Sequence, residues 1–512
     1  MFKKLFRRLN QDPVRENDEY MIEITGNLDE TKKTLDKIIA ESDDVVVREF
    51  NIAKKRRAIM YVIDSLANMQ TLEENIIRPL MYFRRELPDI KNEQKFIDSL
   101  MEDTILFNEV ETTDNVEDAV LGFMAGQALL AIDGVQTFVI IDSRQFEQRG
   151  LQEPPSELLV RGPRDGFNEV LHTNVGLVRR RVRDPNFVLQ FGQIGRRSKR
   201  DFALMYIKGI ADPKLVDEMR YRISCIDTDD TEESGNIEQL VEDNVLSPFP
   251  QVLRTERPDK TVSSLMNGGI AVSLDGTPFA LLAPVTFQFL FKSPEDNYDR
   301  WQIGTLIRLL RYVAAFIALF LPAIYIAMVS YHQGMIPTLL AVSIAGTREG
   351  VPFPSFIEAF AMEFTLELLR EAGIRLPNPI GQTIGIVGGL VIGDAAVRAG
   401  IVSPIMIIVV ALTAISSFSL PSYNVSITFR MLRFALMIIA AGFGLYGIVI
   451  GFIFITIHLA SLKSFGNYYM SPFAPFRLRD WGDLLFRAPL SGQKKRPQVP
   501  NTYDDQKSNW TK

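Results

Sequence analysis

A glycine repeat between residues 377 and 404 constrains the fold of this chain more than any other stretch. Four glycines recur there at a strict spacing of four, separated mainly by isoleucine, valine and leucine: Gly381, Gly385, Gly389 and Gly393. Glycine costs a helix in water roughly 1 kcal/mol relative to alanine. In a bilayer the backbone must satisfy its own hydrogen bonds, so a helix is the default, and a glycine stripe lets another helix approach closely. The stretch predicts a packed membrane helix, with a glycine-rich loop as the alternative.

The composition of the 512-residue chain excludes several classes of function. A net charge of −6 argues against nucleic-acid binding by the protein as a whole. The single cysteine, Cys225, excludes an internal disulfide and a cysteine-based zinc site. The three histidines lie far apart in sequence, so we expect neither a metal nor a cofactor. Polar residues dominate up to about residue 300 and apolar residues follow to about residue 470, which predicts a soluble region followed by a membrane region.

Residues 1–30 are expected to form a flexible basic tail. Phe2, Leu5, Phe6 and Leu9 fall at helical spacing among lysines and arginines. The tail could therefore be a short helix on anionic membrane lipid, or a disordered segment. No apolar core of a signal peptide follows it, so we expect the first large region to stay cytoplasmic.

An internal repeat organises the soluble region into two α+β subdomains, 31–152 and 153–300. A strand, a basic turn, a second strand and a helix are predicted from Val46 and again from Val188, and an Asp-Gly hairpin turn follows later in each copy. We expect a mixed sheet with flanking helices in each subdomain. The residues aligned between the copies are Met60-Tyr61 with Met205-Tyr206, Asn68 with Asp212 as helix N-caps, and Asp133-Gly134 with Asp275-Gly276.

The connector between the copies contains Arg161, Gly162 and Arg164. The glycine permits tight backbone geometry, and we expect the two arginines to tie the copies together or to dock them on a neighbouring subunit. Basic runs at 54–57, 179–183 and 196–200 are read as solvated turns, with contact to headgroups or to another subunit as the alternative. No phosphate-binding loop, dinucleotide fingerprint or nucleophile elbow occurs, so we expect no enzymatic activity.

The region 301–470 is predicted to be an all-α multipass transmembrane domain, followed by a cytoplasmic tail, 471–512. Four spans are expected, at 312–331, 380–397, 401–420 and 434–462. Basic residues before the first and after the last span place both ends in the cytoplasm. Arg430 and Arg433 would then lie outside, against the positive-inside rule, so six spans remain an alternative.

A charged helical segment at 356–372 is the hardest to place. Glu363, Glu367, Arg370 and Glu371 share one helical face about 100° wide. One interpretation is an amphipathic helix at the outer surface with its charges in water. The other is an acidic pore mouth or a subunit contact, because charges at membrane depth usually face a cavity.

The face of the second span opposite its glycines carries candidate pore residues, Thr383, Val387, Leu390 and Asp394. In a ring of identical subunits, Val387 and Leu390 would form an apolar gate, and Asp394 would favour cations. The alternative is that Asp394 pairs with Arg398 at i, i+4 and lines nothing.

Several motifs resemble one family, the A subunits of GerA-type spore germinant receptors. They are Glu153-Pro154, Arg161-Gly162-Pro163-Arg164, Gly166-Phe167 and Asn174 in the connector, the stretch 377–397, and MSPFAPFRLRDW from Met470. The resemblance covers nearly the whole chain and extends to the related stage V sporulation protein AF branch. It implies a multipass protein of the inner spore membrane. Its partners would be a transporter-like B subunit and a lipoprotein C subunit, with which it starts germination in response to nutrients.

These observations favour a receptor subunit that oligomerises into a nutrient-gated cation channel. A solute transporter is an alternative that would predict an inverted repeat in the membrane region, whereas the detectable repeat is in the soluble region. A non-conducting scaffold subunit is another alternative. A membrane-tethered enzyme would need a clustered nucleophile and base, which the sequence lacks.

Overall fold

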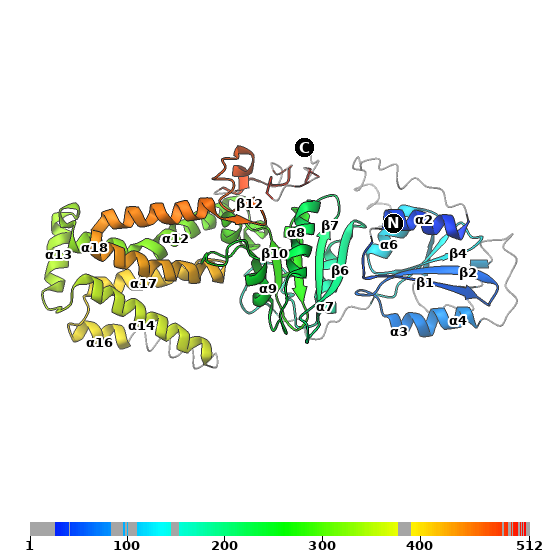
Figure 1. The fold of residues 1–512 in the computed structure, drawn as a ribbon, viewed down its shortest axis with the longest axis horizontal. Coiled ribbons are helices and arrows are strands. Elements are labelled where there is room, and N and C mark those ends of the chain that lie inside the picture. The colour runs from blue at the N-terminus through cyan, green and yellow to red at the C-terminus, as the bar shows by residue number, and fades with distance from the viewer. Residues whose placement is uncertain are drawn as a thin grey trace.

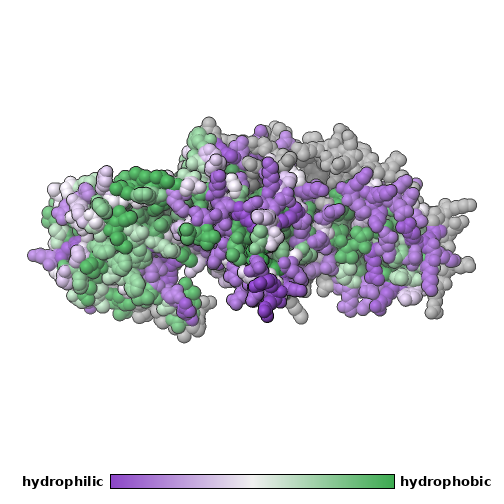
Figure 2. Space-filling view, in the orientation of Figure 1, coloured by the Kyte–Doolittle hydropathy of each residue, from purple (hydrophilic) through white to green (hydrophobic). Residues whose placement is uncertain are grey.

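The computed structural model describes residues 26–39, 41–82, 96–97, 100, 110–144, 153–376, 391–483, 486–489, 493, 495–499, 502, 504 and 506–507. Two sheet-containing subdomains and a helical region follow one another along the long axis of the molecule (Figure 1). On the face shown in Figure 2, the helical end is mostly apolar and the two subdomains are mostly polar. This contrast agrees with the polarity change predicted near residue 300.

The first subdomain is a five-stranded sheet with helices on both faces. Its strand order is β1-β2-β4-β5-β3, and every pairing is antiparallel. Its elements are α2 (Leu28–Ile38), β1 (Val45–Ile52), β2 (Arg56–Ile63), α3 (Met69–Leu72), the π-helix η2 (Glu73–Ile77), α4 (Arg78–Met81), β3 (Val110–Thr113), α6 (Val116–Met124), β4 (Ala128–Ile132) and β5 (Phe138–Ile141).

The second subdomain repeats this fold. Its strand order, β6-β7-β9-β10-β8, is the same, again with antiparallel pairs only. The predicted duplication is therefore confirmed. The predicted mixed sheet is wrong, because all four pairings in each sheet are antiparallel, of which two in each sheet are hairpins. The elements are α7 (Leu171–Arg181), β6 (Phe187–Ile194), β7 (Arg200–Ile207), α8 (Pro213–Ser224), α9 (Ser234–Val241), β8 (Leu253–Thr255), α10 (Pro258–Met266), β9 (Ile270–Leu274) and β10 (Ala280–Ala283).

The two Asp-Gly turns close hairpins as predicted and also cap a helix in each copy. Gly134 and Gly276 have φ of +82° and +84°, which glycine adopts without strain. The Asp133 carboxylate accepts a hydrogen bond from the Leu28 amide at 3.4 Å, and Asp275 accepts one from the Leu171 amide at 3.1 Å. Each turn therefore fixes the first helix of its subdomain to the sheet.

The sequence alignment of Tyr61 with Tyr206 is wrong by one residue. Tyr61 pairs with Leu129, the second residue of β4, whereas Met205 pairs with Ala271, the second residue of β9. Tyr61 therefore corresponds to Met205, on the equivalent strand. The turn before β7 is two residues longer, covering 195–199 rather than 53–55, which shifts the alignment after it. The N-caps Asn68 and Asp212 do correspond.

The helical region is built from antiparallel helices. Two of its helices are long and apolar enough to cross a membrane among the described residues, α12 and α18. The elements are the 3-10 helix η3 (Phe287–Phe291), α11 (Glu295–Tyr298), α12 (Trp301–Ser330), η4 (Gln333–Met335), α13 (Thr338–Arg348), α14 (Ser355–Arg375), α16 (Gly393–Arg398), α17 (Pro404–Phe418) and α18 (Tyr423–Ser461).

Helix α18 is broken at Gly444, whose φ of +61° and ψ of −142° are not helical. The chain reverses there, because a Cβ on Gly451 would lie 2.5 Å from Leu436 Cδ2 on the preceding half. Both ends of α18 meet the second subdomain, since the Thr428 hydroxyl donates to the Pro248 carbonyl and the His458 ring bonds Ser247 Oγ at 2.9 Å. The predicted single span at 434–462 is therefore wrong, and a helical hairpin replaces it.

Helices α14 and α17 both run from the far end toward the second subdomain, opposite to α12. The hydroxyls of Ser330, ending α12, and Ser355, starting α14, lie 2.7 Å apart at the far end. At the near end, the Arg370 guanidinium of α14 lies 4.9 Å from the ring centroid of Phe418, which ends α17.

The chain after α18 returns to the second subdomain through the short strands β11 (Lys463–Ser464) and β12 (Asn467–Tyr468) and the 3-10 helix η6 (Leu478–Asp483). Ser464 Oγ donates to the Gln251 carbonyl at 2.7 Å and accepts from the Val285 amide at 3.0 Å. These contacts fasten the last segment to the second sheet.

Candidate functional site

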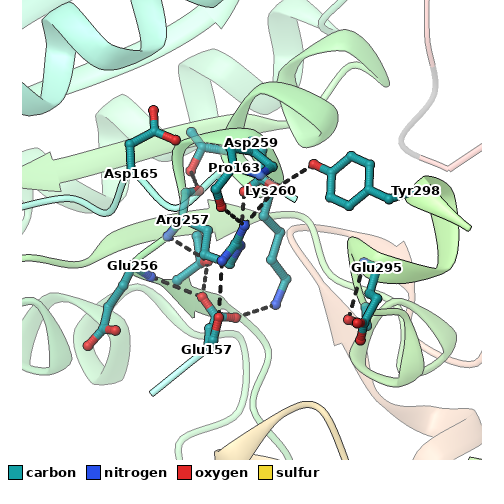
Figure 3. Close-up of polar contacts among 12 residues, drawn as sticks. Glu157, Pro163, Asp165, Glu256, Arg257, Asp259, Lys260, Glu295 and Tyr298 are labelled. Carbon is teal, nitrogen blue, oxygen red and sulfur yellow. Dashed lines mark hydrogen bonds and ion pairs between the residues drawn. The ribbon is translucent and has the colours of Figure 1, made fainter. Parts of the chain in front are cut away.

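The connector between the subdomains is held by a buried arginine at the start of α10. Arg257 is 1% exposed and donates two hydrogen bonds to Asp259, at 3.0 and 3.1 Å. Nη1 donates to the Glu157 carbonyl at 3.1 Å, and Nη2, which also bonds Asp259, donates to the Pro163 carbonyl at 2.8 Å (Figure 3). One guanidinium therefore fixes two points of the connector against α10.

A second contact of the connector is the Glu157–Lys260 ion pair, 2.7 Å long and largely buried. Glu157 also accepts hydrogen bonds from the Thr255 hydroxyl and the Glu256 amide. On the other side of α10, the Tyr298 hydroxyl donates to Asp259 (Figure 3). Burial, followed by this hydrogen bond, raises the pKa of Tyr298, so the phenol stays protonated. The cluster links the connector, α10 and α11 ahead of α12.

A layer of charges then joins α12 to the soluble part. Asp296, 2% exposed, lies 2.8 Å from Arg311 and 3.4 Å from Arg308, both on the first turns of α12. Arg308 also reaches Asp483 of the tail at 3.0 Å, and Lys292 reaches Asp483 at 2.6 Å. Burial opposes ionisation of Asp483, but Lys292 and Arg308 outweigh it and hold its pKa at about 2. A displacement of the second subdomain or the tail would therefore strain or break these ion pairs at the start of α12.

The charged segment predicted at 356–372 lies within α14 and pairs with α18. Glu363 is 1% exposed and lies 3.1 Å from Arg433. Glu367 lies 2.9 Å from Arg430 and 3.0 Å from Arg370. The interpretation of a helix with all its charges in water is therefore wrong for Glu363.

The remaining carboxylates of α14 have separate partners. Glu371 pairs with Arg375 at the exposed end of the helix, at 2.6 Å. Glu358, 1% exposed and outside the predicted face, accepts from the Ser403 amide at 2.8 Å and lies 3.6 Å from Arg348.

Most of the predicted pore and glycine-stripe residues lie outside the described residues. These are Gly381, Thr383, Gly385, Val387, Gly389 and Leu390. Gly393 and Asp394 begin α16, where a Cβ on Gly393 would lie 3.7 Å from Ile407 Cδ1. Asp394 and Arg398 form an exposed ion pair of 2.9 Å.

The predicted connector arginines have different surroundings from those expected. Arg161 lies 3.6 Å from Asp299, just before α12, and is largely exposed, as is Arg164. Gly162 packs under Tyr298, whose ring carbon would lie 2.8 Å from a Cβ. The contact of Arg161 is therefore with the segment leading to α12 and not with the first subdomain.

A residue that the sequence reading missed joins the two copies. Arg179 of α7 forms a buried ion pair with Asp44, ahead of β1. It belongs to the basic run 179–183, which was interpreted as a solvated turn. The sequence signal for the burial of Arg179 was its position four residues after the apolar Val175, because residues four apart share a helix face and Val175 is buried.

Comparison with known proteins assigns the chain to a family. The model for Bacillus/Clostridium GerA spore germination protein matches residues 33–499. Spore germination protein GerLA of Bacillus cereus is 46% identical over 94% of this chain and 98% of its own length. Spore germination protein KA of Bacillus subtilis (strain 168) is 43% identical over 94% of this chain and 87% of its own.

A solved structure is also similar in part. The N-terminal domain of the A subunit of the Bacillus megaterium spore germinant receptor GerK3 aligns with a TM-score of 0.40 and 32% identity, covering 52% of this chain and 98% of that one. The family match extends over most of both subdomains, the helical region and the tail. This chain therefore belongs to the GerA spore germination protein family.

Proposed function

We propose that this chain is the A subunit of a nutrient germinant receptor and that copies of it form a nutrient-gated cation channel. Its place is the inner spore membrane, with the subdomains on the cytoplasmic side, and its partners are a transporter-like B subunit and a lipoprotein C subunit. Its role is conduction rather than enzymatic catalysis. Family membership supports the receptor assignment, and the charges inside the helical region support conduction.

The carrying observation is the charged cluster of Glu363, Glu367, Arg430 and Arg433, in which Glu367 is partly exposed and the other three side chains are buried or nearly so. Ionisable side chains at membrane depth are costly, and they generally face a cavity, a water path or one another. The Glu363 Oε1 atom is buried and has no hydrogen-bond partner among the described residues. Most buried polar atoms in proteins have a partner, so this oxygen leaves Glu363 able to accept a further bond, which supports an element that changes partners during gating.

Helices α14 and α17 run in the same direction, so the chain must return to the far end between them, which supports six crossings in place of four. In this proposal α12, α14, the segment 377–392, α17 and the two halves of α18 each cross once. The even number keeps both chain ends on one side. Arg430 and Arg433 then lie toward the subdomain end of α18, two and five residues after Thr428, which removes their conflict with the positive-inside rule. There they serve as counter-ions of Glu363 and Glu367.

A wide water path needs several subunits, so we propose a closed homo-oligomeric ring. The segment 377–397 remains the candidate pore lining, with Val387 and Leu390 as the apolar gate and Asp394 as the charged ring. In the single chain Asp394 is paired with Arg398. In the ring, Asp394 must therefore either attract cations while it stays paired with Arg398, or release Arg398 and pair with the passing cation.

The test is ion release from spores that carry single variants of the full chain. Val387→Ala and Leu390→Ala should leak potassium without nutrient, because a smaller side chain widens an apolar constriction. Asp394→Asn should slow cation release after nutrient while the protein still assembles. Val449→Ala, on an exposed face of α18, is the matched control and should change nothing. Unaltered flux in all three test variants, at normal protein levels, would remove this segment from the pore.

The alternatives are a solute transporter and a non-conducting scaffold subunit. Flux measurements on the purified chain in liposomes distinguish both alternatives from a channel. A channel passes monovalent cations down their gradient with no other substrate, a transporter needs its solute, and a scaffold passes neither.

A further inference from the structure

A cavity of about 610 Å³ lies between the second subdomain and the C-terminal tail. Its volume falls within the range of small-molecule sites, about 300–1,000 Å³. One wall is formed by α10, η3 and α11, and the other by tail residues. The cavity is separate from the charged cluster between α14 and α18.

The cavity wall carries more positive than negative charge. Five cations line it, Lys260, Lys292, Lys495, Arg496 and Lys507. Three carboxylates line it, Asp259, Asp480 and Asp483. Clustered charges of one sign on low-dielectric walls concentrate the opposite ion.

The three carboxylates are already engaged by groups of the protein. Asp259 pairs with Arg257, which lies behind the wall, and accepts from Tyr298. Asp480 accepts two hydrogen bonds from the Gln498 amide, at 3.1 and 3.2 Å. Asp483 pairs with Arg308, also behind the wall, in addition to Lys292. The charges of Asp259 and Asp483 are therefore compensated in part by arginines behind the wall, and the Asp480 carboxylate is occupied by a neutral amide.

The tail cations differ from those of the second subdomain. Lys260 is committed to Glu157, and Arg496 holds the tail together by bonding Asp504 and the Met266 carbonyl. Lys495 and Lys507 are exposed, and no ion pair joins either to another described residue. Burial lowers the pKa of Lys507, and Asp483 opposes that shift, so an anion bound beside it would further favour its charged form. Lysine binds phosphate and carboxylate as a compact point charge.

We propose that this cavity binds a small soluble anion that carries phosphate or carboxylate groups. Hydroxyl and amide side chains on the subdomain wall, among them Ser263 and Asn267, supply further hydrogen-bonding groups. The bound anion bridges the tail and α10. Because Asp483 reaches Arg308, and Arg487 bonds the carbonyls of Asn297 and Asp299, this bridge also steadies the start of α12.

The experiment uses the purified full chain in nanodiscs of zwitterionic lipid, which removes anionic headgroups as a source of phosphate. Pyrophosphate and citrate are titrated by calorimetry at ionic strength held constant with sodium chloride. Saturable binding of at least one of them is expected, and comparing the two separates phosphate from carboxylate recognition.

Two variants locate the site. The double variant Lys495→Gln/Lys507→Gln should bind about tenfold more weakly, equivalent to about 1.4 kcal/mol. Ser263→Phe, at an exposed position on the wall, narrows the cavity without a charge change and should also weaken binding. Lys199→Gln/Lys214→Gln removes the same charge from exposed positions elsewhere in the second subdomain and should bind as the wild type does.

Absence of saturable binding in the wild type would overturn the proposal. So would an equal loss in the two double variants, which would indicate diffuse electrostatic attraction, or full affinity in Ser263→Phe. The outcome is independent of the channel proposal, because binding is measured without ion flux. A chain that binds anion and conducts nothing contradicts only the channel.

Discussion

Arg179 of α7 and Asp44 ahead of β1 form an ion pair of 3.0 Å in which each side chain is 1% exposed, and this pair joins the two subdomains. The guanidinium also donates to the Phe187 carbonyl at 3.2 Å and lies 4.7 Å from the Phe187 ring centroid. Next to it, the Asp43 amide donates to the Leu189 carbonyl at 2.9 Å on the edge of β6. The first subdomain is therefore attached by buried charge and by backbone hydrogen bonds.

Arg179→Met is expected to destabilise this junction by about 3–5 kcal/mol, because it leaves the Asp44 carboxylate buried and unpaired. Hydrogen exchange of the full chain should show faster exchange at the Asp43 and Leu189 amides. Arg196→Met is the control, since its partners Asp227 and Asp229 are mostly exposed, and it should cost no more than about 1 kcal/mol. Equal protection in both variants would contradict the assigned role of Arg179.

Arg433→Met should destabilise the helical region, because it leaves Glu363 buried without its cation. The double variant Arg433→Met/Glu363→Leu should recover much of that loss, with a coupling of about 0.5–3 kcal/mol. The temperature at which the detergent-purified chain loses its monodisperse peak measures both. Arg375→Met, at an exposed pair, serves as the control. Simple additivity of the two substitutions would show that the pair is not coupled.

The stability of the full chain should fall as pH rises from about 5 to 7, partly through Glu238. Burial, followed by Glu242, raises the pKa of Glu238 from 4.5 to about 7. The folded state then keeps a proton that the unfolded chain has lost, so this stabilisation is complete below the unfolded value and disappears as pH rises through about 7.

Glu238→Gln should flatten this dependence and raise the melting temperature at pH 8 relative to the wild type. Glu232→Gln, an exposed carboxylate of the same subdomain, should leave the slope as it is. An unchanged slope in Glu238→Gln would assign the dependence to other groups.

Arg161→Ala/Arg164→Ala should change the stability of the isolated chain by less than about 1 kcal/mol, because both side chains are exposed and the one ion pair is 3.6 Å long. Loss of germination at normal stability would then report a contact with a neighbouring subunit. Thermal unfolding and spore germination assays measure the two effects separately. If stability, assembly and germination are all normal, the connector arginines have no docking role.

The duplication was readable from sequence because it rests on local signals. Asp-Gly turns and Asn or Asp N-caps act within a few residues, and they recur in both copies. Register was not readable, because the turn between β6 and β7 is two residues longer than that between β1 and β2, whereas the alignment of the Met-Tyr pairs assumes three extra residues and is therefore shifted by one. Since side chains alternate across a strand, the shift moves a residue to the other face. Tyr61 accordingly packs with Phe123, while Tyr206 packs on the opposite face, toward Arg220 of α8.

The candidate sites were less predictable, because they depend on partners far away in sequence. In the sequence alone, Arg430 and Arg433 bear only on the side of the membrane on which that part of the chain lies. In the structure α14 lies beside α18, and the two arginines are the counter-ions of Glu367 and Glu363. Likewise, Gly447 and Gly451 predict a small-residue contact with another helix. Only the backbone of Gly444, with φ of +61° between two apolar runs, distinguishes a helical hairpin from one long helix. The hydropathy profile of the sequence is the same for a helical hairpin and for one long helix.

The break at Gly444 has a consequence for how the chain is made. Unbroken, the 39 residues of α18 would extend about 58 Å, nearly twice the roughly 30 Å of hydrocarbon. In the proposed arrangement of six crossings, the two folded-back halves would enter the bilayer as one unit, and the first half carries Arg430 and Arg433. Because α14 precedes α18 in the chain, Glu363 and Glu367 would be synthesised before the two arginines that pair with them. The order of the helices would then let each arginine meet its carboxylate as α18 is inserted.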